Sequence, residues 1–239
     1  MTRSNNLKHL VLGMGQVGQA IKEILEESCE VVHSKDTEQS QELLDDYDVL
    51  HICYPPSESF VTQTALYQAS FLRDGGLTII HSTVAMGTSD QLKAVHHPIR
   101  GIHPNLVEGI RAFVNFFGGE RAFEAVKIFI PLGIDCRIDS SAKNTEAMKL
   151  WDTTQYGAAI KLEKEIYQWC QDHKLDFDVV YTQANQTYNE GYEKLNHPEY
   201  KKYILQHQEG EIGGHCIIPN CELLDSNIAK DILEFNKML

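Results

Sequence analysis

The sequence predicts an α/β protein: a doubly wound, mainly parallel sheet, followed by a mostly α-helical C-terminal domain with one long central helix. Short apolar runs alternate with helix-periodic stretches over the first 140 residues, which is typical of strand–helix–strand units. A glycine-rich turn joins the first apolar run to the first helical stretch. Beyond residue 144, apolar residues recur at helical spacing over about 30 residues. These features predict one domain at residues 1–140 and a second at residues 141–239.

The glycine-rich turn reads G-x-G-x-x-G and lies between a strand pattern at residues 7–12 and a helical pattern at 19–27. Gly13 is expected to make the tight turn, Gly15 to let a pyrophosphate approach, and Gly18 to let the helix pack on the strand. The helix N-terminus adds free N–H groups and a positive dipole end. This context predicts a Rossmann-type dinucleotide site that comprises Gly13, Met14, Gly15, Gln16, Val17 and Gly18. The alternative is a similar turn that binds nothing.

The end of the second expected strand, at residues 30–33, bears on the choice of cofactor. An NAD site usually has Asp or Glu there to bind the ribose hydroxyls. Asp36 stands one or two residues late for that role, whereas Ser34 and Lys35 could hold the extra phosphate of NADP. Both cofactors stay open, and Ser34 and Lys35 slightly favour NADP.

Further strands are expected at residues 48–54, 77–81, 113–119 and 134–138, and helices at 58–71 and 120–129. Residues 73–76 read as a turn and 99–109 as a polar loop. Ligands of such sheets bind at the carboxyl ends of the parallel strands. We therefore expect four more cofactor-binding residues at the ends of two strands: Tyr54, Pro55, Ser82 and Thr83.

The C-terminal part is predicted to be helical, with a long helix at residues 144–173, a second at 177–195 and a closing one at 228–239. A helix of about 30 residues is about 45 Å long. Such a length exceeds what a small domain covers, so we expect a homodimer that packs through the long helix.

Composition narrows the function classes. The chain has 239 residues, 42% hydrophobic and 23% charged, which suits a soluble globular protein. A net charge of -13 argues against nucleic acid or an anionic membrane as partner, because both require a basic surface. No apolar run is long enough to span a bilayer, and the N-terminal residues show no signal-peptide core. Six dispersed cysteines without a CxxC pair predict a cytoplasmic protein.

A second candidate site is the turn that starts at Gly213. Two adjacent glycines precede His215 and Cys216, so a thiol stands on a backbone that a ligand can approach closely. An ionised thiol is a strong nucleophile near neutral pH. Cys216 is therefore a candidate nucleophile, and a small packed thiol is the alternative.

Several stretches, in order along the chain, resemble the UDP-glucose/GDP-mannose dehydrogenase family of the 6-phosphogluconate dehydrogenase-like superfamily. Residues 81–88 are similar to the family's E-S-T-V-P-P-G-T, and residues 213–219 to its G-G-H-C-I-P. The other matching stretches are residues 13–18, 54–57, 104–109 with 118–119, and 147–150. The resemblance implies an NAD(P)-dependent dehydrogenase.

The resemblance also implies catalytic roles for four residues. Cys216 would attack an aldehyde intermediate, and the thiohemiacetal would give a hydride to a second NAD before the thioester is hydrolysed. Lys149 would hold the substrate oxygen, Glu108 would serve the hydrolytic step, and Thr83 would lie close to the nicotinamide and the catalytic water. The expected substrate-binding residues are His103, Asn105, Thr153, Gly214, His215 and Asn220.

Three departures from the family pattern affect these roles. Asn220 stands where the family has Asp, and Thr153 where it has Asn. Full family members also continue into a second Rossmann-like domain beyond the cysteine turn, so a UDP- or GDP-sugar as substrate is left open. Simple hydride transfer is better supported than a four-electron oxidation.

Three functions remain after these observations. The first is an NAD(P)-dependent oxidoreductase acting on an alcohol or aldehyde of a small polar substrate, with sugar derivatives as one candidate class. The second is a two-electron β-hydroxyacid-type dehydrogenase that uses Lys149, and the third a non-catalytic nucleotide-binding or regulatory module. No metal is expected, because the possible ligands lack a zinc spacing; these are His96, His97, His103, His215, Cys216 and Cys221.

Overall fold

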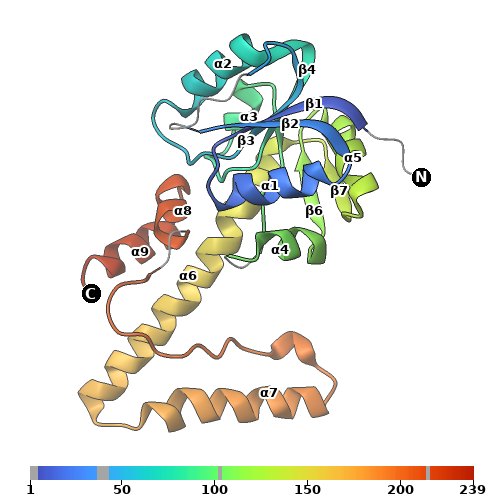
Figure 1. Cartoon of the computed structure of the whole chain (residues 1–239). Helices are drawn as coiled ribbons and strands as arrows, with labels where there is room; N and C mark the ends of the chain where they lie inside the picture. Colours follow the sequence, from blue (N-terminus) through green and yellow to red (C-terminus); the bar gives the residue numbers. More distant parts are fainter. Residues whose placement is uncertain (1–4, 37–42, 102–103, 214–215) are drawn as a thin grey trace. The chain divides into compact units, whose positions relative to one another are not determined.

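The structure is a computed structural model that describes residues 5–36, 43–101, 104–213 and 216–239 (Figure 1). The chain divides into two units, Met1–Lys149 and Leu150–Leu239. The long helix α6, Ala142–His173, begins in unit 1 and continues through unit 2. In the part of the chain that the structure describes, no helix is both long and apolar enough to cross a membrane.

Unit 1 contains a seven-stranded sheet in the order β2-β1-β3-β4-β5-β6-β7 (Figure 1). Neighbouring strands are parallel except β5 and β6, which are antiparallel. The prediction of a mainly parallel sheet is therefore confirmed. The strands are β1 (Asn5–Leu12), β2 (Cys29–Lys35), β3 (Tyr47–Ile52), β4 (Leu72–Ile80), β5 (Val95–His96), β6 (Asn115–Gly118) and β7 (Cys136–Asp139).

Helices cover both faces of this sheet, because alternate residues of each strand point to opposite sides. Val11 packs in one apolar cluster with Ile21 of α1, whereas Leu10 packs in a second cluster with Phe60 of α2. The sheet is thus doubly wound, as predicted. The helices of this unit are α1 (Gln16–Glu26), α2 (Phe60–Phe71), α3 (Thr88–Gln91), α4 (Leu106–Ala112) and α5 (Ala122–Phe129), with a 3-10 turn at Ile130–Leu132.

The register aligns the carboxyl ends of four strands. Leu12, the last residue of β1, pairs with Lys35 of β2 on one side and with Ile52 of β3 on the other. Ile52 in turn pairs with Ile80, the last residue of β4. The chain reverses direction across the sheet between β1 and β3, and this switch point is where doubly wound sheets bind ligands.

Unit 2 consists of helices and one extended segment. After α6 come a π-helical turn (Asp178–Gln183), α7 (Ala184–Lys194), a 3-10 turn (Pro198–Tyr200), α8 (Ile217–Leu223) and α9 (Asn227–Asn236). Residues 201–213 run without regular structure between α7 and α8. Ile217 and Ile232 join α8 and α9 in an apolar cluster that includes Ala158 of α6.

The structure differs from the sequence-based expectation in short elements. Helices α4 and α8 form inside segments expected to be loops, and seven residues are too few to show a helical period. Strand β5 has two residues and was not expected. The expected turn at residues 73–76 is the exposed, irregular first part of β4, where the pairing with β3 shifts register between Tyr47 and Val49.

The described part of unit 1 contains five buried histidines: His9 in β1, His51 in β3, His96 in β5, and His81 and His97 directly after β4 and β5. Burial lowers the pKa of His9 and His97 to about 4 and that of His96 to about 3. Burial also lowers the pKa of His51 and His81 well below the usual value. All five rings are therefore neutral in the folded protein at neutral pH.

We expect the folded state to lose stability steeply as the pH falls below about 6.5, where an unfolded histidine takes up a proton. Because unfolding then binds protons, the stabilisation is complete above that pH and declines as the pH falls toward the folded pKa values. Each buried histidine contributes up to about 1.4 kcal/mol per pH unit. Urea unfolding between pH 7.5 and 5.5 measures this slope, and a free energy of unfolding independent of pH would contradict the expectation.

Candidate functional site

The turn between β1 and α1 is built on two glycines that no other residue can replace. Gly13 has φ +91°, and a Cβ on it would lie 2.6 Å from the backbone nitrogen of Tyr54. A Cβ on Gly18 would lie 1.9 Å from the carbonyl oxygen of Gly13. The Gly13 N–H donates to the carbonyl oxygen of Lys35, at 3.0 Å. The turn is therefore locked between the ends of β2 and β3.

The third glycine of the turn, Gly15, faces open space. A Cβ built on Gly15 meets no heavy atom within 4 Å. Gly15 is also the N-cap of α1, so the first N–H groups of the helix are aimed at this opening. A helix N-terminus with free N–H groups and room for close approach fits a pyrophosphate. All six residues of the predicted turn lie together here.

A carboxylate stands at the same turn. The Met14 N–H donates to Oδ2 of Asp36, at 3.1 Å, directly beyond the end of β2. Ser34 is buried within β2, whereas Lys35 is partly exposed at the end of that strand. The Asp36 side chain therefore contacts the glycine turn directly.

The ends of β3 and β4 are tied together next to this turn. The Ser82 hydroxyl donates to the carbonyl oxygen of Tyr54, at 2.6 Å. Burial raises the pKa of Tyr54 to about 12, and its hydroxyl is 2.6 Å from the Thr64 hydroxyl, so Tyr54 is a structural phenol. Thr83 is half-buried and Pro55 exposed. The predicted cofactor residues after β3 and β4 therefore lie along one edge.

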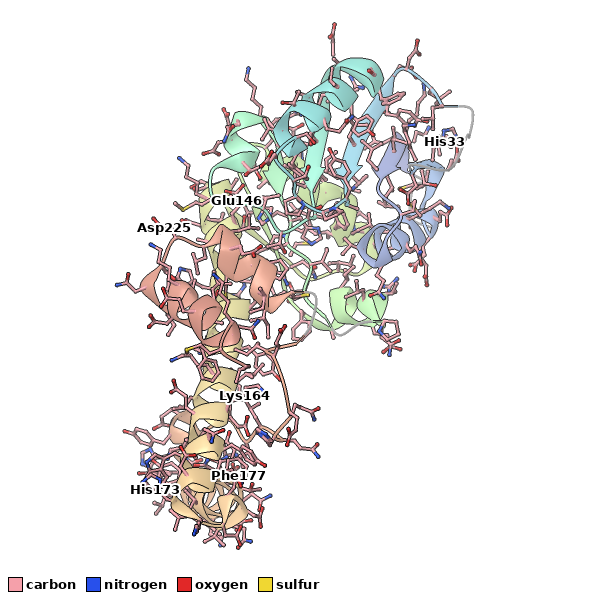
Figure 2. All side chains as sticks on the ribbon, turned by 90° about the vertical axis from the view of Figure 1, so that its left-hand side faces the viewer. His33, Glu146, Lys164, His173, Phe177 and Asp225 are labelled. Carbon is pink, nitrogen blue, oxygen red and sulfur yellow. The ribbon has the colours of Figure 1, made fainter. Side chains whose placement is uncertain are left out.

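The first turns of α6 are anchored to the segment after β4. Glu146 is fully buried, and its carboxylate accepts hydrogen bonds from the backbone N–H groups of Gly87 and Ser89 (Figure 2). His96 bridges the same two elements: Nδ1 lies 2.9 Å from the Thr145 hydroxyl, and Nε2 lies 3.3 Å from the carbonyl oxygen of Ser82.

This anchor determines where Lys149 lies. Lys149 is one turn beyond Thr145 and Glu146 on α6 and is partly exposed. Apart from burial, its ammonium charge is one of the influences that lower the pKa of His96. The structure therefore brings Lys149 into electrostatic contact with a histidine bonded to Ser82.

Glu108 and Asn105 are exposed on and before α4. That helix packs on α1 through Leu106 and Ile110, and Arg111 pairs with Glu27 at 2.5 Å. These contacts of α4 do not involve Lys149, and convergence of Glu108 with Lys149 stays a prediction. His103 lies outside the described residues.

In unit 2, Cys216 is exposed directly before α8, which is docked on α6. A Cβ on Gly157 of α6 would lie 2.6 Å from Ile217, so the two helices touch at a glycine. The Asn220 side-chain amide donates to the Thr153 hydroxyl, at 2.8 Å. The two departures from the family pattern are therefore partners of each other. Gly214 and His215 lie outside the described residues.

The extended segment that leads to Cys216 is held on α6 by two buried charged residues that the sequence did not single out. Nδ1 of His207 lies 2.9 Å from Glu163, which is 2% exposed. Lys164 is 5% exposed and donates to the carbonyl oxygens of Gln208 and Gly210 (Figure 2). Apolar periodicity, from which this helix was predicted, does not reveal buried charged residues, and the apolar Leu162 next to them is 57% exposed.

The cysteines and histidines offer no metal centre in the part of the chain that is described. No group of three or more His, Cys, Asp or Glu residues there is arranged to hold a metal ion. The cysteines are free thiols, and burial raises the pKa of Cys53, Cys136 and Cys221. Cys216 is the exposed thiol of the six.

Comparison with solved structures identifies the fold. A UDP-D-ManNAc dehydrogenase from Pyrococcus horikoshii is 18% identical with a TM-score of 0.78, over 97% of this chain and 68% of that one. The fold is that of known dehydrogenases. A UDP-glucose dehydrogenase from Pyrobaculum islandicum is 13% identical with a TM-score of 0.71, over 100% of this chain and 70% of that one. Neither a protein-family model nor a curated protein sequence matches.

A shorter dehydrogenase is similar over nearly its whole length. The 3-hydroxyisobutyrate dehydrogenase from Mycobacterium tuberculosis is 13% identical with a TM-score of 0.68, over 98% of this chain and 94% of that one. This chain thus spans about two thirds of the compared UDP-sugar dehydrogenases but nearly all of the hydroxyacid enzyme. The fold expected from the motif resemblance is confirmed.

Proposed function

We propose that this protein is an NAD(P)-dependent dehydrogenase acting on a small polar alcohol, with residues 1–140 as the dinucleotide-binding domain and 141–239 as the substrate domain. The observation that carries the proposal is the β1–α1 turn, where two sterically required glycines frame an opening at Gly15. The likeness to dehydrogenase structures over nearly the whole chain supports the same function.

A bound nicotinamide dinucleotide would supply the hydride acceptor. The N–H groups at the start of α1 would hold its pyrophosphate. The ends of β3 and β4, with Tyr54, Ser82 and Thr83, would line its nicotinamide half. Ser82 is fixed by its hydrogen bond to Tyr54, and His96 lies beside its carbonyl oxygen, so this edge is rigid before a ligand binds.

Asp36 supports NAD as the cofactor. A carboxylate beyond the second strand can accept hydrogen bonds from both ribose hydroxyls, and it repels the extra phosphate of NADP. Asp36 already accepts a hydrogen bond from Met14 in the glycine turn. Ser34, which the sequence offered as a phosphate ligand, is buried inside β2. We therefore propose NAD over NADP, against the slight preference drawn from the sequence.

We expect the unmodified protein to bind NAD⁺ more tightly than NADP⁺ and Gly15→Ala to weaken NAD⁺ binding by at least about tenfold, since the added methyl group would occupy the pyrophosphate approach. Calorimetric titration measures both affinities. The fold should be unaffected, because the new Cβ meets no neighbouring atom.

Gly191→Ala is the matched control, because a Cβ there also meets no neighbour and the site lies on α7, outside the dinucleotide domain. This variant should bind NAD⁺ like the unmodified chain. Absence of binding of both dinucleotides by the unmodified protein would refute the enzyme proposal and leave a different role for the chain. Unchanged NAD⁺ affinity in Gly15→Ala would refute the assignment of the pyrophosphate site.

Lys149 is the proposed residue that binds the substrate oxygen and accepts or donates its proton. Its position follows from the buried anchor at Glu146 and from its electrostatic contact with His96. Asn220 and Thr153 are hydrogen-bonded to each other, and neither side chain ionises near neutral pH. This pair therefore supplies no general base for hydrolysis of a thioester. We therefore propose a two-electron oxidation as the main reaction.

A four-electron oxidation through Cys216 is the second candidate. The exposure of this thiol beside the α6–α8 contact favours it. In that reaction the thiolate adds to an aldehyde carbon and the adduct loses a hydride, which leaves a thioester for water to cleave. The two candidates differ in the amount of NADH formed per molecule of substrate.

We expect Lys149→Met to lower kcat at least about a hundredfold, because proton transfer by a positioned side chain contributes on that order. NAD⁺ affinity should stay unchanged. Oxidation of a panel of UDP-sugars and 3-hydroxy acids, followed by NADH absorbance, identifies a substrate and measures the rate. Lys143→Met is the matched control, since Lys143 is an exposed lysine of the same helix that pairs with Asp90.

Cys216→Ser separates the two reactions. It should leave the rate and the yield of one NADH per substrate unchanged if the oxidation takes two electrons. A yield of two NADH in the unmodified enzyme that falls to one in Cys216→Ser would establish the cysteine reaction instead.

A homodimer through α6 is a further proposal. Large side chains on this helix are half exposed although apolar; they are Trp151, Tyr156, Leu162 and Trp169. Covering them with a second copy would remove apolar area from water. We expect a dimer in sedimentation velocity and a shift to monomer in Leu162→Glu. A monomer at all concentrations of the unmodified chain would exclude this arrangement.

A further inference from the structure

Four of the buried histidines form a continuous chain of hydrogen bonds across the sheet of unit 1. Nδ1 of His9 lies 3.0 Å from Nε2 of His51, and Nδ1 of His51 lies 2.9 Å from Nε2 of His81. Nδ1 of His81 lies 2.9 Å from Nδ1 of His97, whose Nε2 lies 3.0 Å from Oδ1 of Asn115. Every ring is buried, so water does not compete for these nitrogens.

Asn115 determines the direction in which the hydrogen bonds between the histidines are donated. Its side-chain NH₂ donates to the carbonyl oxygens of Ile110 and Phe113, at 2.7 and 2.8 Å. Both amide protons are thus used, and the amide oxygen must be the atom that faces His97. An oxygen acceptor requires a proton on Nε2 of His97. Since a neutral imidazole carries one N–H, Nδ1 of His97 is an acceptor.

The remaining tautomers follow one by one. His81 must donate from Nδ1 to His97, which leaves its Nε2 to accept from Nδ1 of His51. His51 then accepts at Nε2 from Nδ1 of His9. The Nε2 atom of His9 is left with a lone pair, and it is buried without a hydrogen-bond partner among the described residues. One end of the chain is therefore open.

We propose that the four histidines form a single buried proton-binding site. Each ring donates its one N–H toward Asn115, and an additional proton enters at Nε2 of His9. The His9 lone pair takes a proton from a hydronium ion, whose O–H bond breaks to leave water, and the histidine chain gains one positive charge. Passing each Nδ1 proton to the next ring then moves the charge toward His97 without a second proton.

The groups around the chain favour the charge at its His9 end. Asp48 on β3 is the neighbouring carboxylate, and its charge raises the pKa of His9 against the effect of burial. Asp48 itself accepts from the backbone N–H of Lys8, at 2.7 Å, and pairs with Arg73.

The other end of the chain lacks such a counter-charge among the described residues. Phe117 stacks on His97 with ring centroids 4.0 Å apart, and Phe129 contacts His51, His81 and His97. Burial is the main cause of the low pKa of His81, and the neighbouring His97, His51 and His96 lower it further. A protonated His97 would thus be surrounded by apolar rings, whereas a protonated His9 has Asp48 as a neighbour.

The tautomers of the four histidines, measured in the full-length protein at neutral pH, test this proposal. Two-bond and three-bond ¹⁵N–¹H couplings after ¹⁵N-histidine labelling give the protonated nitrogen of each ring. We expect Nδ1–H at His9, His51 and His81, which is the minor form of histidine in water, and Nε2–H at His97. A proton on Nε2 of His9 or on Nδ1 of His97 would overturn the proposal.

Asn115→Asp tests the shared charge. A carboxylate in place of the Asn115 amide, at the His97 end of the histidine chain, favours the cationic form of the His97 ring. We expect His97 to show protons on both nitrogens near neutral pH, and a single N–H on His97 in the folded variant would count against one shared site. Asn227→Asp, an exposed position at the start of α9, makes the same charge change and should leave the tautomers unaltered. If Asn115→Asp does not fold, the tautomers of the unmodified chain decide.

Discussion

A buried carboxylate at the start of α6 holds the proposed catalytic edge of unit 1 together. Glu146 has no exposure to solvent, and two backbone N–H groups of the segment after β4 donate to it. Hydrogen bonds to a charged group contribute about 1.5 to 3 kcal/mol each, and a buried charge without partners is far more costly. The loop therefore cannot leave the helix without a large penalty. His96, which bonds the Ser82 carbonyl oxygen and the Thr145 hydroxyl, adds a second link between the same two elements.

The parts of the site that could be predicted from sequence are those that local geometry imposes. Gly13 and Gly18 contact residues near them in the turn or at the end of a neighbouring strand, and such steric demands leave a readable motif. The alternation of strands and helices likewise follows from local hydrophobic pattern. The sequence left Asp36 as a ligand for NAD and Ser34 with Lys35 as ligands for NADP as two alternatives. It could not decide between them, because the contact of Asp36 with Met14 depends on how the chain turns after β2.

Contacts between residues far apart in the sequence could not be predicted. Glu146 reaches Gly87 across 59 positions, and Asn220 reaches Thr153 across 67. Two of the histidines weighed as metal ligands have other partners in the structure: His96 bonds the Thr145 hydroxyl and the Ser82 carbonyl oxygen, and His97 bonds His81 and Asn115. The long helix was predicted from apolar spacing alone, yet its buried positions include Glu163 and Lys164, which bond a segment more than forty residues away.

The pairing of Asn220 with Thr153 has a consequence for how this sequence can change. The family pattern has an acid at the first position and an amide at the second, so both residues of one contact differ together in this chain. Asn220→Asp alone would remove the donor of the hydrogen bond to Thr153, and Thr153→Asn alone would put two amides in a space fitted to an amide and a hydroxyl. The effect of a change at either position therefore depends on the residue at the other.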